Sequence, residues 1–286
     1  YEKTGIMVQA IEKDYYVTML LRLLAQKMPY IVFKGGTSLS KCHKVIRRFS
    51  EDIDITIDTL LSQGQKKKIK QAIVDSAEEL GMTIENLDET RSRRDYNRYV
   101  IAYDSVIPMA SDALKAAVLL ETSYTAVSFP TVLLPVHSYI GDMMEQEAPD
   151  AIKEYSLNPF EMKVQGIDRT LADKVFAVCD YYLQGKVAKH SRHLYDIYKL
   201  LPLVPQDENF RELVKEVRAV RAQSVICPSA LSEVNVPELL EKIIKEKAYK
   251  QDYDGLTTQL LEENVPYDTV IAALKKIAES SLFANN

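Results

Sequence analysis

The residues best suited to chemistry lie in two short segments between positions 30 and 58. In the first segment, Gly35 and Gly36 follow the apolar run Tyr30 to Phe33. A short strand is therefore expected to lead into a turn where backbone N–H groups can approach a ligand closely. Thr37 or Ser38 is expected to cap a following helix. A helix N-terminus behind two glycines presents unpaired donors and a positive dipole end, which suits a phosphate.

The second segment places two carboxylates on one side of a strand. Asp52 and Asp54 alternate with Ile53 and Ile55 in the two-residue period of a strand, so the acidic side chains face the same way. Like charges in this position are destabilising unless a cation lies between them. Oxygen ligands of this kind suit Mg²⁺, which takes one or two carboxylates together with substrate phosphates. The two segments together predict a magnesium site next to a bound triphosphate.

A glycine turn followed along the chain by an Asp-x-Asp strand resembles the arrangement in nucleotidyltransferases related to polymerase β. More narrowly, Lys34-Gly35-Gly36-Thr37-Ser38-Leu39-Ser40 followed by Arg48-Phe49-Ser50-Glu51-Asp52-Ile53-Asp54 resembles the AbiEii/AbiGii toxin family, which includes the MenT-like toxins. The spacing is longer than the superfamily's usual Gly-Ser-x10-Asp-x-Asp, as is typical of the Lys-Gly-Gly-Thr branch. Glu12 to Tyr16 also resembles a segment that precedes the glycines in many of these proteins.

The resemblance assigns roles to these residues. It implies that a nucleotide binds to Lys34, Gly35, Gly36, Thr37 and Ser38, and that Mg²⁺ or Mn²⁺ binds to Asp52 and Asp54. Ser50 either tightens the turn before the metal-binding strand or bonds a substrate phosphate, and the resemblance favours counting it in the site.

A third carboxylate is expected on a neighbouring strand. The apolar run from Ala116 to Leu120 ends in Glu121, as a buried central strand would. Enzymes of the polymerase β type place a third acid there, which binds a metal ion or takes the proton from the attacking hydroxyl. Glu121 is the first choice for this role, and Asp104 is the alternative.

A second constellation lies far along the chain. Leu171, Val175 and Val178 form one helical stripe, and Lys174 lies beside it, where a lysine needs an anionic partner. The resemblance implies that Lys174 binds the β- and γ-phosphates. It also implies that Asp196 orients Lys174 or a metal-bound water. The alternative is that Asp196 merely pairs with Arg192 on a helix surface. Arg192 and His193 could contact substrate or simply face solvent.

Composition excludes several classes of protein. The chain of 286 residues carries 36 Lys and Arg against 41 Asp and Glu, a net charge of -5, so RNA contact would need local basic patches. Two such patches are Lys41 to Arg48 and Arg91 to Tyr99, although the second equally describes a charged edge strand. Three scattered cysteines and four histidines argue against a disulfide framework or a zinc site and favour a cytoplasmic protein. Apolar runs of about five residues are too short for a membrane span.

The pattern of elements predicts two domains. An α/β (α+β) nucleotidyltransferase domain with a mixed sheet is expected over residues 1–140, beginning with an amphipathic helix at about 6–27. A mainly helical domain over residues 141–286 is expected to complete the active site. Within it, Phe160 to Gln165 is one more extended run, and helices are expected at 168–178, 210–220, 237–249 and 269–283.

The resemblance implies a toxin that moves a nucleoside monophosphate from a nucleoside triphosphate to an acceptor hydroxyl. The expected acceptor is RNA, at the 3′ end of tRNA, and the expected partner is a cognate antitoxin of a toxin–antitoxin or abortive-infection system. Two other functions stay open. One is nucleotidyl transfer to a small molecule or a protein side chain, and the other is a non-catalytic interaction module of the same fold.

Overall fold

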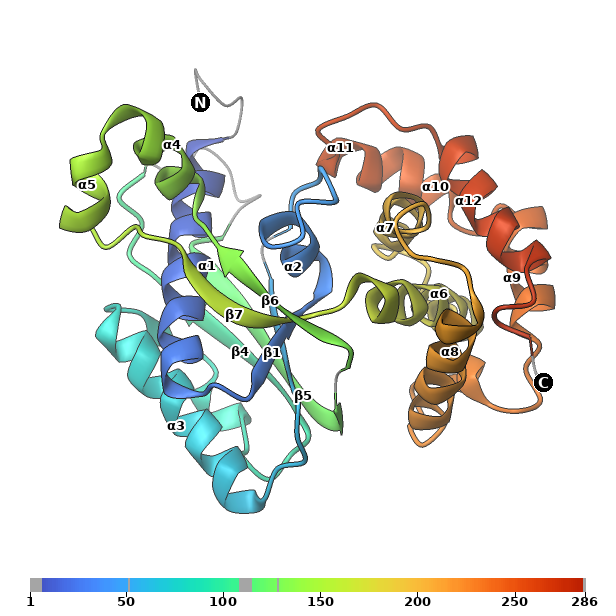
Figure 1. Ribbon diagram of the computed structural model, residues 1–286, viewed down its shortest axis with the longest axis horizontal. Helices are drawn as coiled ribbons and strands as arrows, with labels where there is room; N and C mark the ends of the chain where they lie inside the picture. Colours follow the sequence, from blue (N-terminus) through green and yellow to red (C-terminus); the bar gives the residue numbers. More distant parts are fainter. Residues whose placement is uncertain (1–6, 51, 108–114, 128, 285–286) are drawn as a thin grey trace. The chain divides into compact units, whose positions relative to one another are not determined.

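The computed structural model describes residues 7–50, 52–107, 115–127 and 129–284, and Glu51 of the quoted motif lies outside them. The chain divides into two compact units (Figure 1). The sheet unit comprises Tyr1–His43 and Ser50–Gln165, and the helical unit comprises Lys44–Phe49 and Gly166–Asn286. The six residues 44–49, the last two of which begin the second quoted motif, therefore belong to the helical unit.

The sheet unit contains a seven-stranded mixed sheet in the order β3-β4-β5-β2-β1-β7-β6. Two neighbouring pairs, β1 with β7 and β2 with β5, are parallel, and the other pairs are antiparallel. The strands are β1 (Ile31–Lys34), β2 (Ile53–Ile57), β3 (Thr83–Ile84), β4 (Tyr96–Ala102), β5 (Ala117–Val127), β6 (Thr131–Val136) and β7 (Phe160–Gln165). The central strand β2 carries the acidic motif. Its neighbour β1 leads into the two glycines.

Helices α1 (Val8–Lys27) and α3 (Gln63–Glu79) cover one face of this sheet (Figure 1). Their buried side chains form one core with Ile53, Ile55 and Ile57 of β2, because alternate residues of a strand point to the same face. Asp54 alternates with these isoleucines and so belongs to the opposite face. Shorter helices complete the unit, namely α2 (Gly35–Lys41), α4 (Tyr139–Glu147), α5 (Pro149–Glu154) and the 3-10 turn η1 (Leu87–Glu89).

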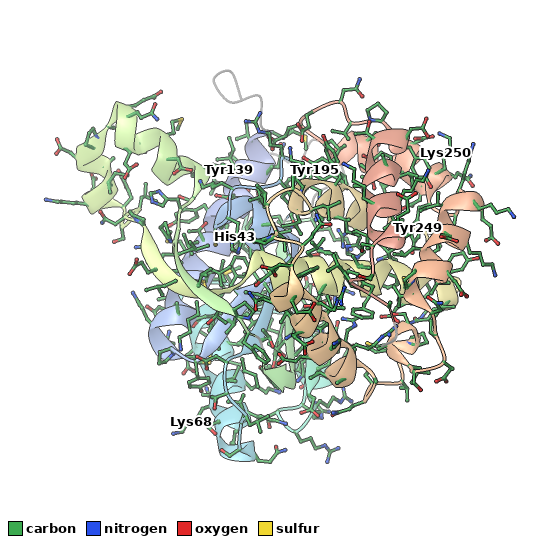
Figure 2. All side chains as sticks on the ribbon, turned by 45° about the vertical axis from the view of Figure 1, so that its right-hand side comes forward. His43, Lys68, Tyr139, Tyr195, Tyr249 and Lys250 are labelled. Carbon is green, nitrogen blue, oxygen red and sulfur yellow. The ribbon has the colours of Figure 1, made fainter. Side chains whose placement is uncertain are left out.

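In the helical unit, amphipathic helices pack around a core that includes the buried Tyr195 and Tyr249 (Figure 2). The Tyr249 hydroxyl donates a hydrogen bond to the Val178 carbonyl at 2.6 Å, which satisfies a buried polar atom. The elements are α6 (Ile167–Leu183), α7 (Arg192–Leu200), α8 (Glu208–Arg221), the turn η2 (Pro228–Ala230), α9 (Val236–Lys245), α10 (Lys250–Asp252), the π-turn η3 (Tyr253–Thr257), α11 (Thr258–Leu260) and α12 (Tyr267–Glu279). Among the described residues, no helix is long and apolar enough to cross a membrane.

The predicted mixed α/β architecture is confirmed. The boundary between the two units lies later in the chain than the predicted boundary at residue 140. These residues lie in the sheet unit because β7 joins the sheet between β1 and β6. The helical patterns of α4 and α5 therefore precede the last strand of the sheet and do not open the second domain.

Two local predictions are wrong. Helix α2 begins at Gly35, so neither Thr37 nor Ser38 is its N-cap. The chain turns directly out of β1 because Gly35 adopts a φ of +82°, which glycine tolerates without strain. Strand β5 does not end at Glu121 but continues to Val127, since polar residues on one face of a strand do not interrupt its hydrogen-bonded ladder.

Candidate active site

The glycine turn is shaped around the carboxylate of Asp54. A Cβ built on Gly35 would lie 1.9 Å from Asp54 Oδ2, so a residue with a side chain cannot occupy this position without displacing the acid. Lys34 and Asp54 are direct partners in the antiparallel ladder of β1 and β2. The glycine therefore permits close approach between the glycine turn and the Asp54 carboxylate of β2.

Four charged residues form one row across four neighbouring strands. Lys34 on β1 pairs with Asp54 on β2, Asp54 pairs with Glu121 on β5, and Glu121 pairs with Arg98 on β4. Residues paired across strands share a face of the sheet. Glu121 is thus the carboxylate beside Asp54, on the face opposite α1 and α3. Asp104 lies exposed beyond the end of β4, six residues from Arg98, so the register favours Glu121 over Asp104.

The acidic pair fits a divalent cation that a nucleotide helps to hold. Asp54 and Glu121 stand side by side with like charges, and the Glu121 side chain is 36% exposed. Among the residues in the structure's described ranges, no three His, Cys, Asp or Glu side chains gather closely enough to hold a metal ion. Since Mg²⁺ is usually bound by one or two carboxylates together with phosphate oxygens and water, this donor set suits a cation that arrives with the triphosphate.

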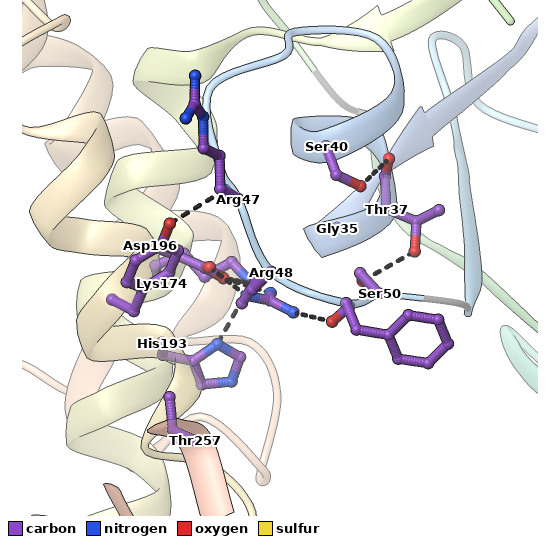
Figure 3. A network of polar contacts seen from close by, with 12 residues as sticks. Gly35, Thr37, Ser40, Arg47, Arg48, Ser50, Lys174, His193, Asp196 and Thr257 are labelled. Carbon is purple, nitrogen blue, oxygen red and sulfur yellow. Dashed lines mark hydrogen bonds and ion pairs between the residues drawn. The ribbon is translucent and has the colours of Figure 1, made fainter. Parts of the chain in front are cut away.

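The side chains of Thr37 and Lys41 hold the turn in place. The Thr37 and Ser50 hydroxyls are 2.9 Å apart (Figure 3), so the segment entering β2 is joined to α2. Lys41, at the end of α2, is buried and contacts Asp14 of α1, the Thr18 hydroxyl at 2.9 Å and the His137 carbonyl at 2.9 Å. Lys41 therefore supports the helix and is not directed at a substrate. Asp14 gives the Glu12 to Tyr16 segment a structural role that sequence reasoning missed.

The helical unit contains a second polar cluster, formed by Arg48, Lys174, His193 and Asp196 (Figure 3). Arg48 donates two hydrogen bonds to the Asp196 carboxylate, at 2.7 and 2.8 Å. Lys174 Nζ lies 2.9 Å from Asp196 Oδ2, the oxygen that also accepts from Arg48 Nη2, and 3.2 Å from His193 Nδ1. The Asp196 side chain is fully buried, and those of Arg48 and Lys174 nearly so.

The charges in this cluster are set by burial and by the neighbouring ions. Burial disfavours the Asp196 anion, but the attraction of Arg48 and then Lys174 outweighs it and holds the pKa of Asp196 below its usual range. Burial lowers the pKa of Lys174, an effect that Asp196 opposes. Burial and the charge of Lys174 hold the pKa of His193 well below its usual value. His193 is therefore neutral, and its Nδ1 accepts from the ammonium, which can only donate.

The cluster places two basic side chains, Arg48 and Lys174, against one carboxylate beside a neutral imidazole. A buried lysine in this setting is suited to an anionic ligand. The structure thus brings Lys174 and Asp196 together, as the second constellation predicts. The alternative pairing of Asp196 with Arg192 is wrong, because the carboxylate turns inward to Arg48 and Lys174.

Arg48 is the cluster member that sequence reasoning missed. It stands in the quoted motif, yet it belongs to the helical unit, where it forms an antiparallel bridge with Leu261. Sequence alone cannot select it, because several basic residues precede the acidic motif. Of the basic segment 41–48, Lys41 and Arg48 are both buried in ion pairs within the protein.

Comparison with known proteins identifies the family of this chain. The family model described as "Nucleotidyl transferase AbiEii toxin, Type IV TA system" matches residues 19–274. The solved structure of MenT4, a nucleotidyltransferase toxin from Mycobacterium tuberculosis H37Rv, is similar in fold, with a TM-score of 0.51 and 16% sequence identity over 97% of this chain and 83% of that chain. A search of curated proteins finds no match. Because the family model spans most of the chain, this protein belongs to the AbiEii family of nucleotidyltransferase toxins of type IV toxin–antitoxin systems.

Proposed function

We propose that this toxin transfers a nucleoside monophosphate from a nucleoside triphosphate to a hydroxyl at the 3′ end of tRNA, with Mg²⁺ or Mn²⁺ as cofactor. The observation that carries the proposal is the pairing of Asp54 and Glu121 beside Gly35, on the face of the sheet opposite α1 and α3. That arrangement supplies what the reaction needs, namely donors for phosphate oxygens and adjacent acids for a cation and a proton.

In the proposed reaction, the backbone of Gly35 and Gly36 and the hydroxyls of Thr37 and Ser38 bind the triphosphate, with Lys34 and Ser50 beside them. Asp52, Asp54 and Glu121 would hold the divalent cation. When bound, the cation supplies positive charge that neutralises phosphate oxygens and activates the hydroxyl. The acceptor oxygen forms a bond to the α-phosphorus as the bond to the β-phosphate oxygen breaks and pyrophosphate leaves.

Glu121 and Lys174 are proposed to accept the proton and to bind the leaving phosphates, respectively. Glu121 takes the proton from the attacking hydroxyl, since it is the acid on the strand beside Asp54. Lys174 is proposed to bind the β- and γ-phosphates, while Asp196 and His193 hold its amino group in position. The geometry of the buried cluster supports this role, because Lys174 needs an anionic partner and shares the Asp196 carboxylate with Arg48.

The test is incubation of the protein with each labelled nucleoside triphosphate, Mg²⁺ and purified tRNA. We expect labelled tRNA with the intact protein. Asp52→Ala should lower the rate at least about 1000-fold, because losing a metal ligand removes several kcal/mol of transition-state stabilisation. Lys68→Ala, on the outer surface of α3 (Figure 2), is the matched control and should label tRNA normally.

Three results would count against the proposal. Equal labelling by Asp52→Ala would remove the metal-dependent mechanism. Label found in protein or in a small molecule, and not in tRNA, would replace the acceptor. Undiminished labelling after chelation of divalent cations would remove the cofactor.

A further inference from the structure

Strand β4 carries two side chains beside the acidic pair that the proposed reaction leaves without a role. Arg98 is the ladder partner of Glu121, and Tyr96 lies two residues before it on the same face of the strand. Both are open to solvent, with Tyr96 52% exposed and the Arg98 side chain 53% exposed. The same strand buries Asn97 and Tyr99 on its other face.

The structure separates these two residues from the rest of the basic and aromatic patch at 91–99. Arg91 and Arg94 donate to backbone carbonyls of their own loop, at Thr90 (2.9 Å) and Glu89 (3.0 Å), so they stabilise local structure. Within strand β4, the members of the patch on the face that carries Glu121 are therefore Tyr96 and Arg98.

Both side chains interact with Glu121 in ways that a substrate could replace. Arg98 Nε lies 3.7 Å from Glu121 Oε1, and an exposed ion pair of this kind contributes little to stability. The Tyr96 hydroxyl hydrogen-bonds to the Glu121 carboxylate, while the Tyr96 ring stays accessible to solvent.

The order of strands across the sheet places Tyr96 and Arg98 on the acceptor side of the proposed reaction. The glycine turn follows β1, on one side of Asp54, and Glu121 lies on β5, on the other side. A hydroxyl that gives its proton to Glu121 must approach that acid. The next strand outward is β4, about 10 Å from β2 by the usual spacing of strands. Residues on β4 thus face the acceptor and not the triphosphate.

We propose that Tyr96 and Arg98 bind the acceptor RNA, with a base stacked on the Tyr96 ring and a backbone phosphate paired with Arg98. The inference rests on the proposed function and adds to it where the acceptor strand lies. Aromatic rings stack on any base, and arginine pairs with phosphate through its planar fork. Transfer of Arg98 from Glu121 to a phosphate also leaves the carboxylate available for the hydroxyl proton.

The experiment measures kcat and KM separately for tRNA and for the nucleotide, with the intact protein and with variants on β4. Tyr96→Ala and Arg98→Ala should each raise the KM for tRNA about tenfold, with the KM for the nucleotide changed less than twofold. Tyr96→Phe keeps the ring and should restore the KM for tRNA. Arg98→Ala should also reduce the slope of log KM against log salt by about 0.7, the loss of one single-strand phosphate contact.

Lys68→Ala again serves as the control for loss of a surface cation, and melting temperatures check that each variant is folded. Unchanged KM for tRNA in both alanine variants would overturn the inference. So would equal damage from Tyr96→Phe and Tyr96→Ala, because the hydroxyl contact to Glu121 and not the ring would then matter. In either case, labelling of tRNA by the intact protein but not by Asp52→Ala would leave the proposed function standing. Absence of tRNA labelling by the intact protein would remove both.

Discussion

At the scale of single residues, two positions concentrate the physical constraints on the site. Gly35 combines a positive φ with a Cα that faces the Asp54 carboxylate. His193 is a neutral ring held against a buried ammonium. Each of these residues can be tested by one substitution.

Gly35→Ala is expected to abolish nucleotidyl transfer and to lower the free energy of unfolding by about 1–3 kcal/mol, because the new Cβ meets Asp54 and the backbone is strained. Urea denaturation and labelling of tRNA measure the two effects. Gly64→Ala is the control, since its Cβ would meet only Ser62 Oγ at 3.9 Å, and it should be neutral or slightly stabilising. Full activity in Gly35→Ala would contradict the close approach.

His193 makes stability depend on pH in a defined direction. Its pKa is lowered in the folded protein, so the unfolded chain binds a proton that the folded chain does not. Stability due to this residue is therefore complete above the unfolded pKa, about 6.5, and is lost as the pH falls below it.

His193→Asn keeps an acceptor for Lys174 but does not titrate. Relative to this variant, the intact protein should lose about 1 kcal/mol of unfolding free energy between pH 6.5 and 5.5. Because His190 is retained in both proteins, the difference isolates His193. Parallel stability curves over this range would show that the ring is not held neutral.

At the scale of elements, the segment 44–49 is the notable feature. It connects α2 to β2 along the chain, yet it folds with the helical unit. Phe49 N–H donates to the Leu260 carbonyl at 2.9 Å, Glu262 N–H donates to the Arg47 carbonyl at 3.0 Å, and the Tyr195 hydroxyl accepts from Arg47 N–H at 3.0 Å. These backbone contacts place Arg48 against Asp196.

Arg48→Lys keeps the charge but loses the two parallel hydrogen bonds to Asp196. We expect unfolding free energy to fall by about 1–3 kcal/mol and kcat to fall with it, since Lys174 then shares a less well held carboxylate. Arg47→Lys, an exposed neighbour that contributes its backbone N–H, is the matched control and should change neither quantity. Equal stability of the two variants in urea would show that the bidentate pair is dispensable.

At the scale of the whole molecule, the proposed chemistry draws on residues from 34 to 196, carried by both units. The family consists of toxins, so the proposed chemistry predicts that the protein's effect on cells depends on groups in each unit. The overall charge of -5 supplies no general attraction for nucleic acid. Recognition of an acceptor therefore has to come from local groups such as Arg98.

Expression in a bacterial host is expected to arrest growth, and either Asp52→Ala or Lys174→Met is expected to relieve the arrest completely. The first variant removes a proposed metal ligand from the sheet unit, and the second removes the buried ammonium from the helical unit. Growth curves at matched protein levels measure the effect, with Lys68→Ala as the toxic control. Continued arrest by both variants would separate toxicity from the proposed reaction.

The sequence by itself determined the local parts of this protein. The isoleucine alternation around Asp54 predicts β2, the glycines predict the turn, and the motif predicts the family, because strand periodicity and glycine conformations are properties of a few adjacent residues. Tertiary structure alone decided three things: that Glu121 lies in register with Asp54, that Arg48 pairs with Asp196 across 148 positions, and that residues 141–165 complete the sheet. Each is a choice among several chemically equivalent partners, which only packing of distant segments can make.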